Sequence, residues 1–142
     1  MKKIISLTAV LLISLTLVLS LSACGNSVDA SGLWENAKYL EDTEFGEGEK
    51  TVVVKVKVEE QSITFTVNTD KETVGEALLE HKLISGEQGD YGLYIKSVNG
   101  ITADYDVDKS YWAFYVNDEY ATSGVDTTKI DENVTYSLQY TK

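Results

Sequence analysis

The sequence has 142 residues, of which 23 are Asp or Glu and 12 are Lys, with no Arg, so its formal net charge is −11 at pH 7. This length favours one compact domain. Nucleic acids and anionic lipid surfaces are held by clustered cations, which an acidic chain without Arg does not offer. The composition therefore excludes both as electrostatic partners.

The first residues predict a secretory leader. Residues 1–3 are cationic and residues 4–21 are uncharged and mostly apolar, which is typical of a signal peptide. An uncleaved membrane-spanning anchor is the alternative. Leu21-Ser22-Ala23-Cys24 then matches the bacterial lipobox. We expect residues 1–23 to be a lipoprotein signal peptide and Cys24 to be lipidated. The mature protein would then be extracytoplasmic, with acyl chains anchoring it to the bacterial cell membrane.

Residues 24–50 are expected to form an acidic flexible tether between the anchor and the domain. Six acidic residues lie between Glu35 and Glu49, and the segment has little periodicity. Trp34 is an exception. We expect it to belong to a loosely packed N-terminal segment or a short helix. The alternative is that it docks on the domain or reaches a ligand.

Residues 51–142 predict an α+β domain that is mainly β. Apolar residues alternate with polar ones over 52–58 and 63–67, which favours two strands of a hairpin. A helical stripe follows, and Thr69 or Asp70 is expected to cap its N-terminus. The stripe consists of Val74, Ala77, Leu78 and His81.

Three further extended runs predict the remaining strands. They cover residues 93–98, 111–116 and 134–140, and the first ends in Asn99-Gly100, a strong hairpin signal. A short extra strand is expected near residues 119–121. The predicted order is β-β-α-β-β-β, in a small mixed sheet with one packed helix.

The residue types needed for catalysis or metal binding are scarce. His81 is the only histidine, and we expect it to pack or cap the helix rather than to bind a metal or cofactor. Lipidation would consume Cys24, the only thiol. We expect the chain not to be an enzyme and to carry no catalytic residue, metal or cofactor.

One acidic motif resembles the start of a calcium-binding loop. Asp104, Asp106 and Asp108 have the spacing that opens a calcium-binding loop. Lys109 and Tyr115 stand where that loop requires Gly and Glu. We therefore expect a surface turn here, and a weak, irregular calcium site is the alternative.

Aromatic residues are concentrated near the end of the chain, where ten lie between residues 91 and 140. In the strand 111–116, Trp112 and Phe114 share one face, whereas Tyr111 and Tyr115 share the other. One face must be core. The opposite face then carries two tyrosines, which either pair across strands or form a platform for a flat or ring-shaped ligand.

Four blocks of the sequence resemble the transcobalamin-like C-terminal domain family, and the chain looks like a bacterial lipoprotein member of it. The resemblance implies a β-grasp-like packing of the helix on a small sheet, together with ligand binding. In the vertebrate carriers of this family, cobalamin is clamped between this module and a helical barrel, which is not encoded here. Asn117-Asp118 replaces the family's usual Asn-Gly. The matching blocks are 73–79, 92–100, 111–117 and 136–140.

Together these features predict a membrane-anchored extracytoplasmic binding lipoprotein that captures a small polycyclic ligand, with a cobalamin-like corrinoid as the candidate. Tyr94, Tyr111, Trp112 and Tyr115 are the expected contact surface, and a core position is the alternative for Trp112. A transporter or a surface protein is the expected protein partner. The alternative function is a surface-displayed module that docks on a protein or polysaccharide and has no small-molecule ligand.

Overall fold

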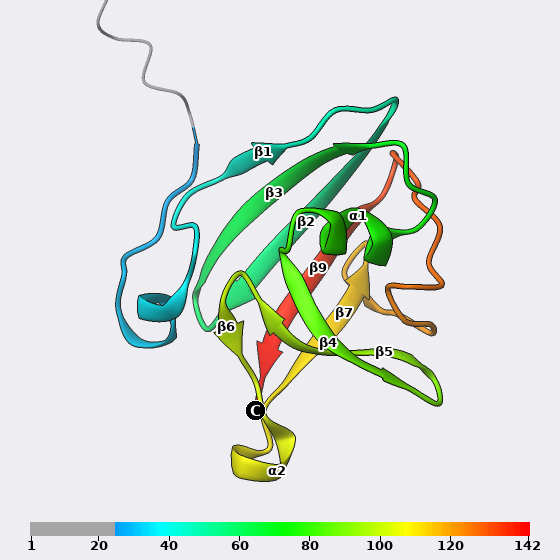
Figure 1. Cartoon of the computed structure of the whole chain (residues 1–142). Coiled ribbons are helices and arrows are strands. Elements are labelled where there is room, and N and C mark those ends of the chain that lie inside the picture. The colour runs from blue at the N-terminus through cyan, green and yellow to red at the C-terminus, as the bar shows by residue number, and fades with distance from the viewer. Residues whose placement is uncertain (1–24) are drawn as a thin grey trace, which may run out of the picture.

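The computed structural model describes residues 25–142 as a mainly β fold with short helices (Figure 1). The predicted signal peptide and the lipidation of Cys24 lie outside the described residues. Within residues 25–142, no helix has both the length and the apolar character needed to cross a bilayer. The helical elements are η1 (Gly32–Asn36), α1 (Val74–Glu80) and α2 (Tyr105–Asp108).

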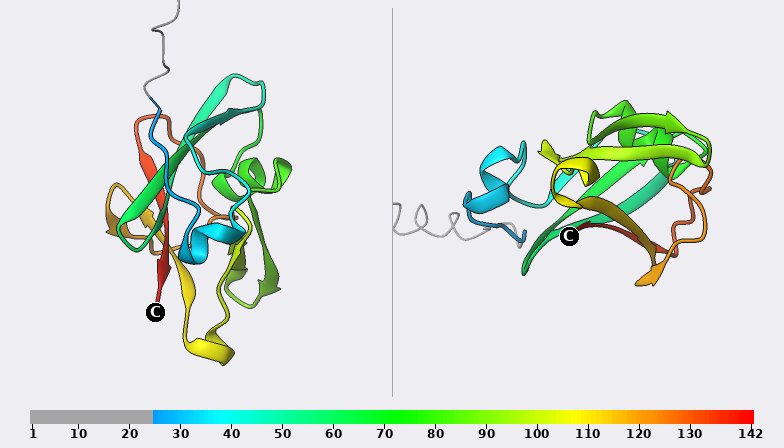
Figure 2. Two further views of the ribbon diagram at one scale, coloured as in Figure 1. Left: turned by 90° about the vertical axis from the view of Figure 1, so that its left-hand side faces the viewer. Right: turned by 90° about the horizontal axis from the view of Figure 1, so that it is seen from below.

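The strands form two sheets. A six-stranded mixed sheet has the order β1-β3-β2-β9-β7-β8, and a small antiparallel sheet has the order β4-β5-β6. Figure 2 shows the small sheet and α1 as a layer that covers one face of the larger sheet. The strands are β1 (Thr43–Phe45), β2 (Lys50–Val58), β3 (Gln61–Thr69), β4 (Ile84–Gly89), β5 (Gly92–Val98), β6 (Ile101–Thr102), β7 (Tyr111–Val116), β8 (Glu119–Tyr120) and β9 (Thr135–Thr141).

The β2–β3 hairpin forms the centre of the core, as its alternating pattern predicts. The two strands pair from Lys50↔Thr69 to Val58↔Gln61, and the inward side chains of both are fully buried. The last strand, β9, lies between β2 and β7, parallel to the first and antiparallel to the second. This confirms the predicted mixed sheet, its packed helix and the short extra strand, which is β8.

The structure adds elements to the predicted order. No strand is predicted over residues 84–89, but these residues form β4, which includes Gly86 and Gly89. A bulge follows Ser85, and a Cβ on Gly86 would lie 2.0 Å from the Tyr94 carbonyl oxygen, so the bulge requires glycine. The expected turn at Asn99-Gly100 connects β5 to β6, with both residues at positive φ.

The prediction of a flexible tether over residues 24–50 is corrected. Residues 26–45, which we call the N-terminal strap, lie along the edge of the large sheet, where β1 pairs in parallel with β3. Trp34 is only 3% exposed and belongs to the core. Tyr39 packs edge-to-face on Phe45 and Phe65, with ring centroids 5.1 and 5.8 Å away. Aromatic burial thus outweighs the polar composition of the segment.

A buried asparagine also secures the strap to the small sheet. The Asn99 carbonyl oxygen accepts a hydrogen bond from Lys38 N at 2.9 Å, and the Asn99 amide bonds both the N–H and the carbonyl oxygen of Tyr39 at 2.9 Å. His81 follows α1 as its C-cap, and its ring lies 5.7 Å from that of Phe45. The expected packing role of His81 is thereby confirmed, with a strap residue as its partner.

A capping box begins α1, and Thr73 rather than Thr69 or Asp70 is the N-cap. Thr73 Oγ1 accepts from Glu76 N, and Glu76 Oε2 accepts from Thr73 N, both at 3.2 Å. Thr69 Oγ1 instead accepts from Lys71 N at 3.1 Å, and Asp70 Oδ1 from Glu49 N at 3.0 Å. The two predicted caps therefore stabilise the turn that precedes the helix.

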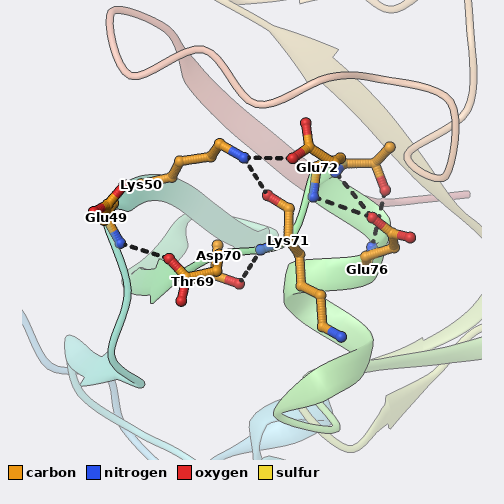
Figure 3. Close-up of polar contacts among 8 residues, drawn as sticks. Glu49, Lys50, Thr69, Asp70, Lys71, Glu72 and Glu76 are labelled. Carbon is orange, nitrogen blue, oxygen red and sulfur yellow. Dashed lines mark hydrogen bonds and ion pairs between the residues drawn. The ribbon is translucent and has the colours of Figure 1, made fainter.

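Lys50 joins β2 to the same turn. Its Nζ donates to the Lys71 carbonyl oxygen at 3.1 Å and to Glu72 Oε1 at 2.9 Å (Figure 3). The hydrogen bond from Lys50, together with the charge of that lysine, lowers the pKa of Glu72 below its usual value. The start of α1 is thus connected to the β2–β3 hairpin by side chains as well as by its core face.

Replacing Thr73 by alanine should lower the free energy of unfolding by about 1 kcal/mol, because the Glu76 N–H loses its acceptor. Thr73→Ser keeps the hydroxyl and should cost much less. Urea denaturation followed by circular dichroism measures both changes. Equal losses for the two variants would contradict a role for the hydroxyl.

Candidate functional site

A cleft of about 310 Å³ lies where residues of the large and small sheets meet. Strands β5 and β7 and the loop after β8 form its walls. We call it the aromatic cleft, because six aromatic side chains line it: Tyr91, Tyr94, Tyr111, Trp112, Phe114 and Tyr120. Tyr91 and Tyr120 are exposed, so the cleft presents apolar rings with polar tips to solvent.

Trp112 belongs to both the core and the cleft. Its side chain is 6% exposed, its Nε1 donates to the Ile101 carbonyl oxygen at 3.1 Å, and its ring packs edge-to-face on Tyr140 at 5.7 Å. The hydrogen bond holds the indole in place, and Trp112 is also among the residues that line the aromatic cleft. Trp112 therefore has both a core position and a place in the cleft wall.

A shallow depression of about 460 Å³ adjoins the cleft, lined by Tyr94, Tyr105 and Tyr111. Tyr94 and Tyr111 also line the aromatic cleft, so the two hollows share these two side chains. Tyr94 is 44% exposed. Lys109 Nζ lies 4.8 Å from the centre of the Tyr105 ring, an intramolecular cation–π contact at the rim.

The structure brings together three of the four predicted contact residues. Tyr94, Tyr111 and Trp112 line the cleft, whereas Tyr115 does not. Tyr115 lies opposite Tyr120 in the β7–β8 pair, with ring centroids 5.5 Å apart. Its position corresponds to the alternative reading, a cross-strand aromatic pair.

The acidic motif before β7 forms α2, a single turn of helix with no buried residue between β6 and β7, in agreement with the expected surface turn. Asp104 is its N-cap and accepts a hydrogen bond from Asp106 N at 3.1 Å. Asp108 accepts hydrogen bonds from both N and Oγ of the buried Ser110, and these lower its pKa below the usual value. These carboxylates thus organise the backbone between Tyr105 and Tyr111. Within the described chain, no group of three or more His, Cys, Asp or Glu side chains is placed to hold a metal ion.

The lowered pKa of Asp108 predicts a pH-dependent contribution to stability. Because the folded pKa lies below the unfolded value of about 3.9, the contribution is present above that value and is lost as the pH falls through the folded pKa. Asp108→Asn should therefore lower the melting temperature at pH 7 and have a smaller effect near pH 3. Differential scanning calorimetry at both pH values measures this. A difference that stays constant between them would refute it.

Sequence reasoning missed the residues that complete the cleft. Tyr91 comes from the end of the β4–β5 hairpin and Tyr120 from β8, and only the fold brings them near Trp112. Asp126 was also missed. Its Oδ2 accepts from Gln88 Nε2 at 3.3 Å, and its buried Oδ1 has no partner among the described residues. The Ser123-Gly124 pair signals the loop, but not its contact with the hairpin.

Comparison with known proteins supports the fold. Residues 71–142, more than half of the chain, match a family described as a domain of unknown function (DUF4430). No curated protein matches. Among 17 matching chains of solved structures is a protein from Ruminococcus gnavus ATCC 29149, named as a candidate metal-binding protein. It is 29% identical, with a TM-score of 0.62 over 66% of this chain and 98% of that one.

A second solved structure is haptocorrin in complex with Cbi, with 16% identity and a TM-score of 0.53. The match covers 69% of this chain and 26% of haptocorrin, so the chain spans about a quarter of that protein. At this identity the likeness shows the fold alone. The sequence resemblance to the transcobalamin-like domains is therefore supported at the level of fold.

Proposed function

The chain belongs to the DUF4430 family, and we propose that its domain captures a small polycyclic ligand, a corrinoid, in the aromatic cleft. The observation that carries the proposal is the pair of tyrosine-lined hollows, the cleft and the depression, which share Tyr94 and Tyr111. Aromatic rings with exposed faces bind flat apolar ligands by stacking and by edge contacts. The fold shared with haptocorrin, solved with Cbi, supports the ligand class.

The size of the cleft sets how such a ligand lies. A volume of about 310 Å³ is at the lower end of small-molecule sites, which range from about 300 to 1,000 Å³. A corrinoid would therefore lie across the cleft and the depression, with Tyr94 and Tyr111 between them, and would keep one face open. That open face leaves room for a receiving protein, and we propose a transporter or another surface protein in this role.

We further propose that the protein is an extracytoplasmic lipoprotein, held on the cell membrane through acyl chains on Cys24. The cationic and apolar leader followed by Leu21-Ser22-Ala23-Cys24 supports this. Two or more acyl chains would hold the protein durably, since each buried CH₂ contributes about 0.8 kcal/mol.

Titration with cobinamide and with cobalamin tests the ligand. The intrinsic fluorescence of Trp112 and of the cleft tyrosines should change saturably as the ligand binds, with calorimetry as an independent readout. A Kd tighter than about 100 μM, equivalent to about −5.5 kcal/mol, is expected of a capturing protein. No saturable signal at that concentration with either ligand would refute the proposal.

Truncating the shared tyrosines should weaken binding. Tyr94→Ala and Tyr111→Ala are each expected to raise the Kd of cobinamide by about 5- to 30-fold, or roughly 1–2 kcal/mol, because each removes a ring from both hollows. Tyr115→Ala is the matched control outside the cleft and should leave the Kd within about twofold. Equal effects of the three variants would place the ligand elsewhere.

A further inference from the structure

The N-terminal strap begins almost at the proposed lipidation site. Asn26 N donates to Asp42 Oδ2 at 3.0 Å, and Asp42 N donates to the Asn26 carbonyl oxygen at 2.9 Å. Asp42 Oδ1 in turn accepts from Thr64 N of β3 at 2.7 Å. Two residues later, Val28 N donates to the Leu40 carbonyl oxygen at 2.8 Å. The chain is thus bound to the sheet from Asn26 onward.

Only Gly25 separates Cys24 from this first fixed residue. Even a fully extended backbone spans only about 7 Å between the Cα atoms of Cys24 and Asn26. A domain of this size has a radius of gyration of about 13 Å. The connection is therefore much shorter than the domain is wide, and the domain cannot turn freely about its anchor.

We infer that the domain sits directly on the bilayer, with the β1 edge of the large sheet facing the lipid and the aromatic cleft facing away. This inference rests on the lipid anchor proposed above. It replaces the expected flexible tether by a fixed orientation. The cleft then opens toward the space from which ligands and receiving proteins arrive.

The order of strands places the cleft far from the anchor. Strand β1 is one edge of the six-stranded sheet, β8 is the other, and β3, β2 and β9 separate β1 from β7. Four strand spacings of about 4.8 Å put β7, which carries Tyr111 and Trp112, roughly 19 Å from β1. Figure 2 shows the blue and cyan start of the chain on one side of the domain and the orange segment after β8 on the other.

The charge of the β1 edge does not attract this edge to the membrane. Glu41, Asp42 and Glu44 lie in or beside β1, and all three are exposed. Carboxylates are repelled by anionic lipid, so the short covalent connection alone keeps this edge at the surface. The competing orientation lays the outer face of the large sheet, which carries Lys55, flat on the lipid, with β1 and β8 at equal depth.

Two matched cysteine variants distinguish the orientations. Glu41→Cys marks a position two residues before β1, where Glu41 forms a bridge with Ser27, and Glu119→Cys marks β8 at the opposite edge. Both side chains are exposed. The full chain would be produced in a bacterium that processes lipoproteins and then reconstituted in phosphatidylcholine vesicles containing a nickel-chelating lipid. Because Cys24 is acylated, a spin label reacts only with the introduced thiol.

Lipid-bound nickel should increase the relaxation rate of the spin label several times more at position 41 than at position 119. Inserting about 20 Gly and Ser residues between Gly25 and Asn26, with a mean span of roughly 25 Å, should make the two rates equal. Equal rates in the membrane-bound chain without the insertion would overturn the orientation and leave the anchor standing. Recovery of unacylated protein apart from the vesicles would overturn the anchor, and the orientation with it.

Discussion

Replacing Trp34 by alanine should lower the free energy of unfolding by about 3–5 kcal/mol, the range for truncating a large buried aromatic residue. Trp34 is the buried residue of η1 and packs with the core, although it lies in a segment of acidic and polar composition. Its removal leaves a cavity between the strap and the rest of the domain. The N-terminal strap should loosen with it, because Trp34 is a strap residue that packs in the core.

Trp34→Phe is the matched control. The buried Nε1 of Trp34 has no hydrogen-bond partner among the described residues, so phenylalanine loses only buried area and no polar contact. Trp34→Phe should lower the free energy of unfolding by less than half as much as Trp34→Ala does. Urea denaturation with hydrogen exchange at the strap amides measures both variants. A cost below about 1 kcal/mol for Trp34→Ala would mean that the strap contributes little to the fold.

Trp112→Ala should lower the free energy of unfolding by a similar amount, about 3–5 kcal/mol, and abolish corrinoid binding at the same time. The substitution removes a wall of the aromatic cleft and a neighbour of Tyr140. It also leaves the Ile101 carbonyl oxygen without its indole donor, which adds a desolvation cost of about 1–3 kcal/mol if water does not replace it.

Trp112→Phe separates the two roles. Phenylalanine keeps much of the apolar contact but cannot donate to Ile101, so it should cost stability mainly through that hydrogen bond. Below the denaturation midpoint, cobinamide binding should weaken by less than tenfold. If Trp112→Phe bound cobinamide as poorly as Trp112→Ala does, the indole edge rather than the ring volume would form the contact.

The periodic elements of this fold could be predicted from the sequence because each has one buried face. The valines of β2 alternate against a continuous core, and the stripe of α1 faces the same core. The Asn99-Gly100 turn has a local cause in backbone conformation. Where burial and local backbone conformation favour the same element, the sequence pattern predicts that element correctly.

The strap could not be predicted, since its buried residues contact different neighbours and therefore show no period. Trp34 of η1 joins the core, Tyr39 contacts Phe65, and Phe45 contacts His81. Strand β4 was missed for another reason. Most of its side chains are small or polar and all after Ile84 are exposed, so only backbone pairing with β5 defines it.

The candidate site was predicted only in part, because some of its residues follow a local pattern and others come together only through tertiary packing. The aromatic run 111–116 is visible in the sequence, and three of its residues, Tyr111, Trp112 and Phe114, line the cleft together with Tyr94. Tyr115 belongs to the same aromatic run but lies beside Tyr120 in a cross-strand pair. Tyr91 and the loop that contains Gly124 approach Trp112 only through tertiary packing, which no local pattern encodes.

The position of β9 has a consequence for biosynthesis. This strand is the last of the described chain to be made, yet it lies between β2 and β7 and buries Tyr136 and Leu138. Until it leaves the ribosome, β2 and β7 have no common neighbour to join them. The large sheet is therefore incomplete until β9 has been made, and β1-β3-β2 and β7-β8 remain separate groups of strands until it joins them.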